Sequence, residues 1–295
     1  MVIRVTERSL SHNAMRGLQA NLGRLSQTEN QLTSGKQISR PSDSPTGTMT
    51  AMLLRSDMHT QDQYARNAQD GTNWLNTIDS ALGMATDQTQ RVRDLMIQGM
   101  SAGAGGSDSA RSGIATEIDQ IRKSVIGVAN TRYVDRPVFG GTTNGGAAYD
   151  ASGSYIGDAG TVSRTVAEGT KVRVDSAGQD VFGTGDTQLF KVLSDVSDHL
   201  LNDPSQLSND LDRLDAALKG MQTAQASVGA RSNRVETLQQ TASDRQLELQ
   251  GQLSEVEDID LPKTITEMTL QQTAYQAALG ATAKVIQPSL MDFLR

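Results

Sequence analysis

The chain has 295 residues, with 27 basic and 34 acidic side chains and a formal net charge of −7. An acidic chain of this kind lacks the basic surface that non-specific nucleic-acid binding requires, so we expect no nucleic-acid partner. The absence of cysteine excludes disulfide scaffolds, thiolate metal sites and cysteine nucleophiles. The longest apolar run, Ala51 to Leu54, is too short for a membrane span or for the core of a signal peptide, and we expect neither.

The first 40 residues predict a long helix with a narrow apolar face. Leu18, Leu22, Leu25 and Leu32 recur at helical spacing, and Met15 precedes them by three residues. This spacing is typical of the a and d positions of a coiled coil. We therefore expect the helix to pack against another helix along this seam.

Four more helices follow from the apolar spacing. Two are predicted over 75–96 and 114–128, and the glycines between them indicate an antiparallel hairpin. Another is predicted over 207–235. The last begins after Asp260, since proline is tolerated in a first helical turn, so the preceding helix is expected to end near 257.

Residues 140–186 differ from the rest of the chain because they contain 11 of its 27 glycines. Two runs within them, 161–166 and 170–174, alternate apolar and polar residues, which is the pattern of a half-buried strand. We interpret this segment as a small β insertion with tight turns. A partly disordered, glycine-rich linker is the alternative.

The expected fold class is mainly α: a long antiparallel helical bundle or coiled-coil rod with paired N- and C-terminal helices and a small inserted β domain. We expect three parts. Residues 1–43 and 257–295 form a terminal coiled coil, residues 44–139 and 187–256 form a helical rod, and residues 140–186 form the insertion.

The last helix carries a seam as narrow as that of the first helix. Its candidate interface residues are Ile265, Met268, Tyr275, Leu279, Ile286, Leu290 and Phe293. Burial of one leucine contributes about 1.5–3 kcal/mol, and ordering the backbone of one residue costs about 1–2 kcal/mol. A seam offers about one apolar side chain per 3.5 residues. Our hypothesis is that both terminal helices are mobile in the monomer and become ordered against other subunits.

No motif predicts catalysis. The Gly35-Lys36 pair lacks the upstream glycine and the following Ser or Thr of a phosphate-binding loop. The acids at 255, 257, 258 and 260 lie in an acidic stretch and are interpreted as a solvated helix face. We expect no enzyme, no cofactor and no metal site. A catalytic role for the insertion is the remote alternative, because it contains no histidine.

The segment after the first helix contains Ser34, Gly35, Arg40, Pro41, Asp43 and Pro45. Ser-Gly followed by two prolines predicts a break between two helices. This segment resembles the turn of the flagellin family of axial flagellar proteins. Its Arg-Pro-Ser-Asp-x-Pro form is more similar to the hook–filament junction proteins of that family than to filament flagellins.

Two more segments share the resemblance. Ala-Asn-Thr at 129–131 followed by Phe-Gly-Gly-Thr at 139–142 is similar to the place where the helical rod of these proteins enters a variable β domain. The C-terminal segment 261–295, with Gln-Gln-Thr-Ala-x-Gln-Ala and Ser-Leu-x-x-Phe-Leu, is similar to the last helix of the family. The three motifs occur in the family's order.

The resemblance implies a structural subunit that joins the flagellar hook, through hook-associated protein 1, to the flagellin filament. It also implies a ring of identical subunits in the axial tube and an export chaperone. The expected location is the extracellular flagellum, reached through the flagellar type III apparatus. The residues expected to carry assembly are the seam residues of the two terminal helices.

Two other functions stay open from the sequence. The chain is a filament flagellin in the first alternative, since its final Leu-Arg is similar to that of flagellin. In the second, more remote alternative it is a type III-secreted effector or translocator.

Overall fold

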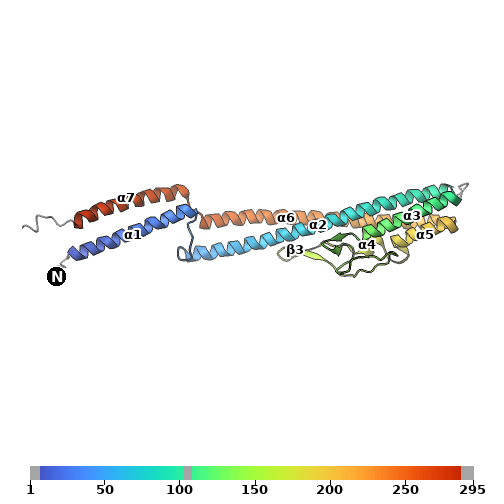
Figure 1. Ribbon diagram of the computed structural model, residues 1–295, viewed down its shortest axis with the longest axis horizontal. Coiled ribbons are helices and arrows are strands. Elements are labelled where there is room, and N and C mark those ends of the chain that lie inside the picture. Colours follow the sequence, from blue (N-terminus) through green and yellow to red (C-terminus); the bar gives the residue numbers. More distant parts are fainter. Residues whose placement is uncertain (1–6, 103–107, 287–295) are drawn as a thin grey trace, which may run out of the picture. The chain divides into compact units, whose positions relative to one another are not determined.

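The computed structural model describes residues 7–102 and 108–286, which divide into two units. One unit is Thr60–Arg245, and the other joins Met1–His59 to Gln246–Arg295. Two long helices contribute to both units (Figure 1). Within the described residues, no helix is apolar over a length that would cross a bilayer.

The helices confirm the predicted fold class, with a small β insertion in a mainly α chain. In chain order they are α1 (Glu7–Ser34), α2 (Pro45–Ala102), α3 (Asp108–Ala129), α4 (Gly178–Phe182), α5 (Leu189–Asn202), α6 (Leu207–Glu257) and α7 (Leu261–Ile286). Short 3₁₀ turns flank α5, namely η1 (Gly185–Thr187) and η2 (Pro204–Gln206). The strands are β1 (Arg132–Tyr133), β2 (Arg136–Pro137), β3 (Ser163–Ala167) and β4 (Thr170–Arg173).

In the Thr60–Arg245 unit, α3 runs antiparallel to α2, as the sequence predicts. Arg91 of α2 pairs with Glu117 of α3 at 2.9 Å. The chain returns along α2 as α6, and Arg93 pairs with Asp215 at 2.7 Å. These exposed pairs contribute little stability; the unit is held by the apolar faces of the helices, which meet in one buried cluster.

The insertion is structured, so the alternative of a disordered linker is wrong. β3 and β4 form an antiparallel hairpin in which Ser163 lies opposite Arg173. Gly169 makes the turn between them with φ 65°, a conformation that glycine adopts without a steric penalty. Both strands lie within three residues of their predicted positions.

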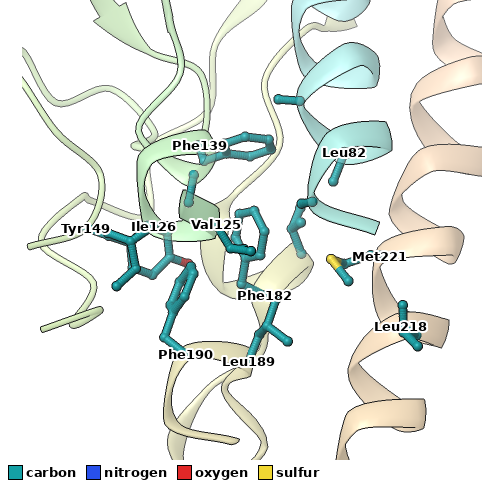
Figure 2. Packing of buried hydrophobic residues seen from close by; sticks show 14 of the residues in the cluster. Leu82, Val125, Ile126, Phe139, Tyr149, Phe182, Leu189, Phe190, Leu218 and Met221 are labelled. Atoms are coloured by element: carbon teal, nitrogen blue, oxygen red, sulfur yellow. The ribbon is translucent and has the colours of Figure 1, made fainter. Parts of the chain in front are cut away.

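Half of the chain's ten aromatic rings gather where the insertion meets the helices. Figure 2 shows Phe139, Tyr149, Phe182 and Phe190 together beside α3. The ring centroids of Tyr149 and Phe190 are 4.8 Å apart, and those of Phe139 and Phe182 are 5.2 Å apart. Such pairs stabilise by about 0.5–1.5 kcal/mol beyond the burial of their area. This cluster fixes the insertion on the helices of its unit.

Candidate assembly surface

In the unit that contains the two ends of the chain, the break between α1 and α2 lies beside the break between α6 and α7. Ile259 donates its backbone N–H to the carbonyl oxygen of Gly35 at 3.1 Å, and Gln37 donates to the carbonyl oxygen of Glu257 at 2.6 Å. The residues between them form an antiparallel bridge. The α1–α2 break and the α6–α7 break are thus hydrogen-bonded to each other. We call this crossing, residues 35–37 with 257–259, the joint.

Glu257 is the central side chain of the joint. Its carboxylate is 5% exposed, and it accepts a hydrogen bond from Lys36 Nζ at 2.9 Å and lies 2.6 Å from Arg55 Nη2. The solvated-face interpretation is therefore wrong for Glu257, although Glu255 and Asp258 are exposed as expected. Sequence reasoning missed this cluster because its members lie more than 200 residues apart.

The break after α1 follows from its glycine and proline. Ser34 is the last residue of α1, and Gly35 follows with φ 70°, which is the common left-handed end of a helix. Pro45 is the first residue of α2, where a missing backbone N–H costs nothing. Ser44 caps this helix, since its Oγ accepts the N–H of Gly47 at 3.1 Å.

Between the two helices, Asp43 closes a tight turn. Its Oδ2 accepts the backbone N–H groups of Ser39 at 3.1 Å and of Arg40 at 2.9 Å. Arg40 and Pro41 are exposed on the outside of this turn. Asp43 therefore has a structural role in the break, and the other two residues remain accessible to a neighbouring molecule.

The packed face of α1 differs in part from the predicted seam. Leu18, Leu25 and Leu32 are half-buried, but Leu22 is 49% exposed and Met15 is 51% exposed. Among residues 12–34, the least exposed positions are Ala14, Leu18, Asn21, Leu25, Thr28, Gln31 and Leu32. Alternate positions of the seam, at Ala14, Asn21 and Thr28, are therefore small or polar, and the first two lie one residue before Met15 and Leu22.

The same shift occurs on α7, which pairs with α1; Thr28 Oγ1 lies 3.0 Å from Gln271 Oε1. Met268 and Tyr275 are half-buried as predicted, whereas Ile265 is 47% exposed and Leu279 is 44% exposed. Among residues 261–283, the least exposed positions are Thr264, Met268, Gln271, Tyr275, Ala278 and Thr282. The helix pair thus keeps part of its apolar surface outside its own seam.

Four exposed apolar residues of the two helices lie on one side of the pair, whereas the exposed Leu270 of α7 lies away from them. Met15 and Leu22 each follow a seam position by one residue, and Ile265 and Leu279 do the same on α7. In an antiparallel pair related by a two-fold axis normal to its plane, equivalent positions come to the same side. We call these four residues the apolar strip.

Polar side chains line a groove on the opposite side of the pair. Arg24 and Gln31 of α1, with Lys263 and Glu267 of α7, line a groove of about 340 Å³. This groove therefore contrasts with the apolar strip, although Leu270, one residue before the seam position Gln271, is a further apolar side chain that is 69% exposed outside the strip.

The α1–α7 pair has very little buried core in its described part. Thr28 and Thr264 are the two side chains of these helices that are buried over the ranges 12–34 and 261–283, and both are polar. Ile286 ends α7, but its side chain lies outside the described part; Leu290 and Phe293 lie outside the described residues altogether. Within the described ranges, the pair lacks the buried apolar area that stabilises an isolated hairpin.

Comparison with known proteins relates both ends of the chain to one family. The model of the bacterial flagellin N-terminal helical region matches residues 5–142, and that of the C-terminal helical region matches residues 211–294. The chain is 24% identical to flagellar hook-associated protein 3 of Escherichia coli K12, over 95% of this chain and 96% of that protein. It is 26% identical to the flagellar filament 33 kDa core protein of Treponema phagedenis, over 90% of each.

A solved structure shows the same fold. The flagellar hook-associated protein-3 of Legionella pneumophila superposes with a TM-score of 0.61, over 70% of this chain and 98% of that one, at 14% identity. At this identity the likeness concerns the fold alone. Because the two family models together span most of the sequence, from residue 5 to 142 and from 211 to 294, the chain belongs to the bacterial flagellin family.

Proposed function

We propose that this chain is a structural subunit of the junction between the flagellar hook and the filament. The observation that carries the proposal is the α1–α7 pair, whose described part has polar buried side chains and an apolar strip left exposed. Burial of that strip against neighbouring subunits would supply the apolar area that the pair lacks alone. The relative named hook-associated protein 3 supports the junction over other axial positions.

The proposed neighbours are further copies of this chain in a ring, hook-associated protein 1 on the hook side and flagellin on the filament side. Residues 1–43 and 257–295 would form the inner coiled coil, and the insertion, 140–186, would face outward. The proposed role is to bind hook subunits on one side and filament subunits on the other. This role requires neither catalysis nor a cofactor.

Extracellular location requires that the subunit be exported, and we propose the flagellar type III route. A terminal helix pair with little buried core unfolds at low cost, which suits passage through a narrow channel. The segment 261–295 is the proposed docking site for an export chaperone, because an amphipathic helix fits an apolar groove. Chaperone binding that persists after deletion of 261–295 would rule this site out.

The junction role is tested in a deletion strain, by electron microscopy and by an assay of flagellin in the medium. We expect bare hooks and shed flagellin, because exported filament subunits would have no surface on which to assemble. Filaments of normal length would contradict the proposal.

The apolar strip is tested with Leu279→Asp expressed in the same strain. A charge on this residue is costly once the residue is buried against a neighbour but tolerated while it is exposed. We expect a folded, exported monomer that does not enter the flagellum. Thr273→Asp, an exposed position on another face of α7, is the matched control and is expected to restore motility.

A filament subunit is the second candidate, favoured by the 26% identity to a filament core protein. Purified subunits separate the two functions. A filament subunit would extend a seed into long filaments, whereas a junction subunit would stop after a short layer.

A further inference from the structure

A cleft of about 660 Å³ lies in the Thr60–Arg245 unit, between α6 and the segment that follows β4. Val181 of α4 forms one wall, and Ala216, Gly220 and Ala224 form the floor on α6. A cleft of this volume is in the range of ligand-binding sites. Because the floor residues are small, a bound chain can approach the helix backbone closely.

The cleft is long. Its lining on α6 extends from Ala216 to Arg231. At 1.5 Å per residue, this stretch measures about 22 Å along the helix. An extended chain rises about 3.3 Å per residue, so about six or seven residues would span it. The dimensions suit an extended peptide better than a compact small molecule.

Basic side chains dominate the charged part of the lining. Arg173, Lys219 and Arg231 line the cleft, with Asp180 as the accompanying acid. Arg173 is already paired with the buried carboxylate of Asp175 at 3.0 Å. The positive charge available to a ligand therefore lies on Lys219, which is exposed, and on Arg231.

In the described part of the chain, the guanidinium of Arg231 donates hydrogen bonds to neutral acceptors. It donates to the carbonyl oxygen of Asp175 at 2.7 Å, to Ser176 Oγ at 3.2 Å and to the carbonyl oxygen of Ser227 at 3.2 Å. Burial lowers the pKa of Arg231, and the nearby Arg173 acts in the same direction, whereas the charge of Asp175 acts in the opposite direction. A carboxylate brought into the cleft would offset this lowering, because a nearby negative charge favours the protonated guanidinium.

We propose that this cleft binds a short, extended, acidic peptide segment of another protein chain, with one carboxylate at Arg231 and a second near Lys219. These two residues are twelve positions apart on α6, or about 18 Å along the helix axis. Two acidic residues five or six positions apart in an extended segment match that separation. The site lies apart from the terminal helices in sequence, so the proposal does not depend on the proposed junction role.

The probe is an acetylated hexapeptide amide, Glu-Ser-Ala-Thr-Ser-Glu, titrated into the isotope-labelled full-length chain and followed by NMR. We expect saturable shifts of the backbone amides of 216–231. The same peptide with glutamine in both end positions is expected to bind at least tenfold more weakly, because only the carboxylates differ.

The diagnostic variant is Lys219→Glu, which reverses a charge on the exposed rim without disturbing the bonds that Arg231 makes to the 175–176 turn. It is expected to weaken peptide binding at least tenfold. Lys171→Glu, at an exposed position of β4 outside the cleft lining, is the matched control and is expected to bind within twofold of the parent chain.

Three outcomes would overturn the proposal. The first is the absence of saturable shifts. The second is equal weakening by Lys219→Glu and Lys171→Glu, which would mean that the peptide responds only to overall charge. The third is citrate binding as tightly as the peptide, which would assign the cleft to small anions.

Discussion

His199, near the end of α5, is joined to α6 by a charged hydrogen bond. Its Nδ1 is 2.6 Å from Asp210 Oδ2, and the Asp210 side chain is 2% exposed. This hydrogen bond raises the pKa of His199 above its ordinary value of 6.5, and the charges of Asp210, Asp195 and Asp203 act in the same direction. The folded state thus holds this proton more tightly than the unfolded state.

The free energy of unfolding is therefore expected to depend on His199. Its contribution is fully present below about pH 6.5 and is lost as the pH rises through the raised pKa of the folded state. We expect urea unfolding to show decreasing stability over that window, and His199→Gln to reduce the decrease. His59→Gln, at an exposed position of α2, is the control that keeps it. Equal pH dependence in the parent and His199→Gln would contradict the assignment.

Val134 is strained in the turn between β1 and β2. It has φ 45° and Asp135 has φ 63°, so both central residues of this two-residue hairpin lie in the left-handed region. That turn favours asparagine followed by glycine, and a β-branched residue is unfavourable in it. Val134 is also 75% exposed, so its side chain gains little from burial in return.

Replacement of Val134 by asparagine is expected to stabilise the Thr60–Arg245 unit by about 1 kcal/mol, because the strain is removed at little loss of packing. The thermal midpoint would rise by about 2–4 °C for a unit of this size. Val134→Thr keeps the β-branch and is expected to leave the midpoint unchanged. An equal rise in both variants would show that side-chain polarity, and not backbone strain, is responsible.

At the scale of elements, Glu257 at the end of α6 links Lys36, which lies just after α1, to Arg55 of α2. Glu257→Gln removes the carboxylate that Lys36 and Arg55 share. Because both cations are nearly half exposed and regain water, we expect a modest local loss of about 1 kcal/mol. Faster amide exchange at Gln37 and Ile259, whose N–H groups cross the joint, is the measurement.

Glu255→Gln is the matched control for the joint. This acid lies two residues earlier on α6 and is exposed, so its loss is expected to leave exchange at Gln37 and Ile259 unchanged. Equal effects of the two replacements would mean that net charge, and not the buried carboxylate, holds the joint.

The existence of the helices could be predicted from the sequence, but the packed register of the terminal pair could not. Gly35 and Pro45 indicate the break locally, since each constrains its own backbone. The seam positions Asn21 and Thr28 are polar, so an apolar pattern points instead to Leu22, which is exposed. Contact with the partner helix determines which side of an apolar stripe is buried, and within the described residues part of the α1 and α7 stripes is left exposed.

Over the whole molecule, the buried apolar core is unevenly distributed. The hydrophobic cluster extends in sequence from Ala68 to Val235 and lies within the Thr60–Arg245 unit. In the described part of the other unit, Ala51 and Leu249 are the buried apolar residues. This is the physical basis for expecting one cooperative unit and one that depends on neighbours.

The sequence predicts this unevenness only in part. The narrow seams of the terminal helices already indicate a marginal pair, because each offers few apolar side chains per turn. The aromatic cluster around Phe139, Tyr149 and Phe182 was not predictable, since glycine-rich segments rarely suggest a core. Phe182 of α4 lies more than 30 residues after Tyr149 in sequence, and the two rings meet only in the folded insertion.

The fragment 60–245 is therefore expected to fold alone, with a single unfolding transition close to the main transition of the full chain, because it retains the whole buried cluster. Calorimetry of both proteins measures this. In the full-length monomer, we expect amides of α1 and α7 to exchange much faster than those of α3 and α5, since opening the terminal pair exposes little apolar area. Strong protection of α1 and α7 at low concentration would show that the pair is stable alone. The exposed apolar strip would then be a surface of a preformed hairpin, and burial of the strip would not be what orders the pair on assembly.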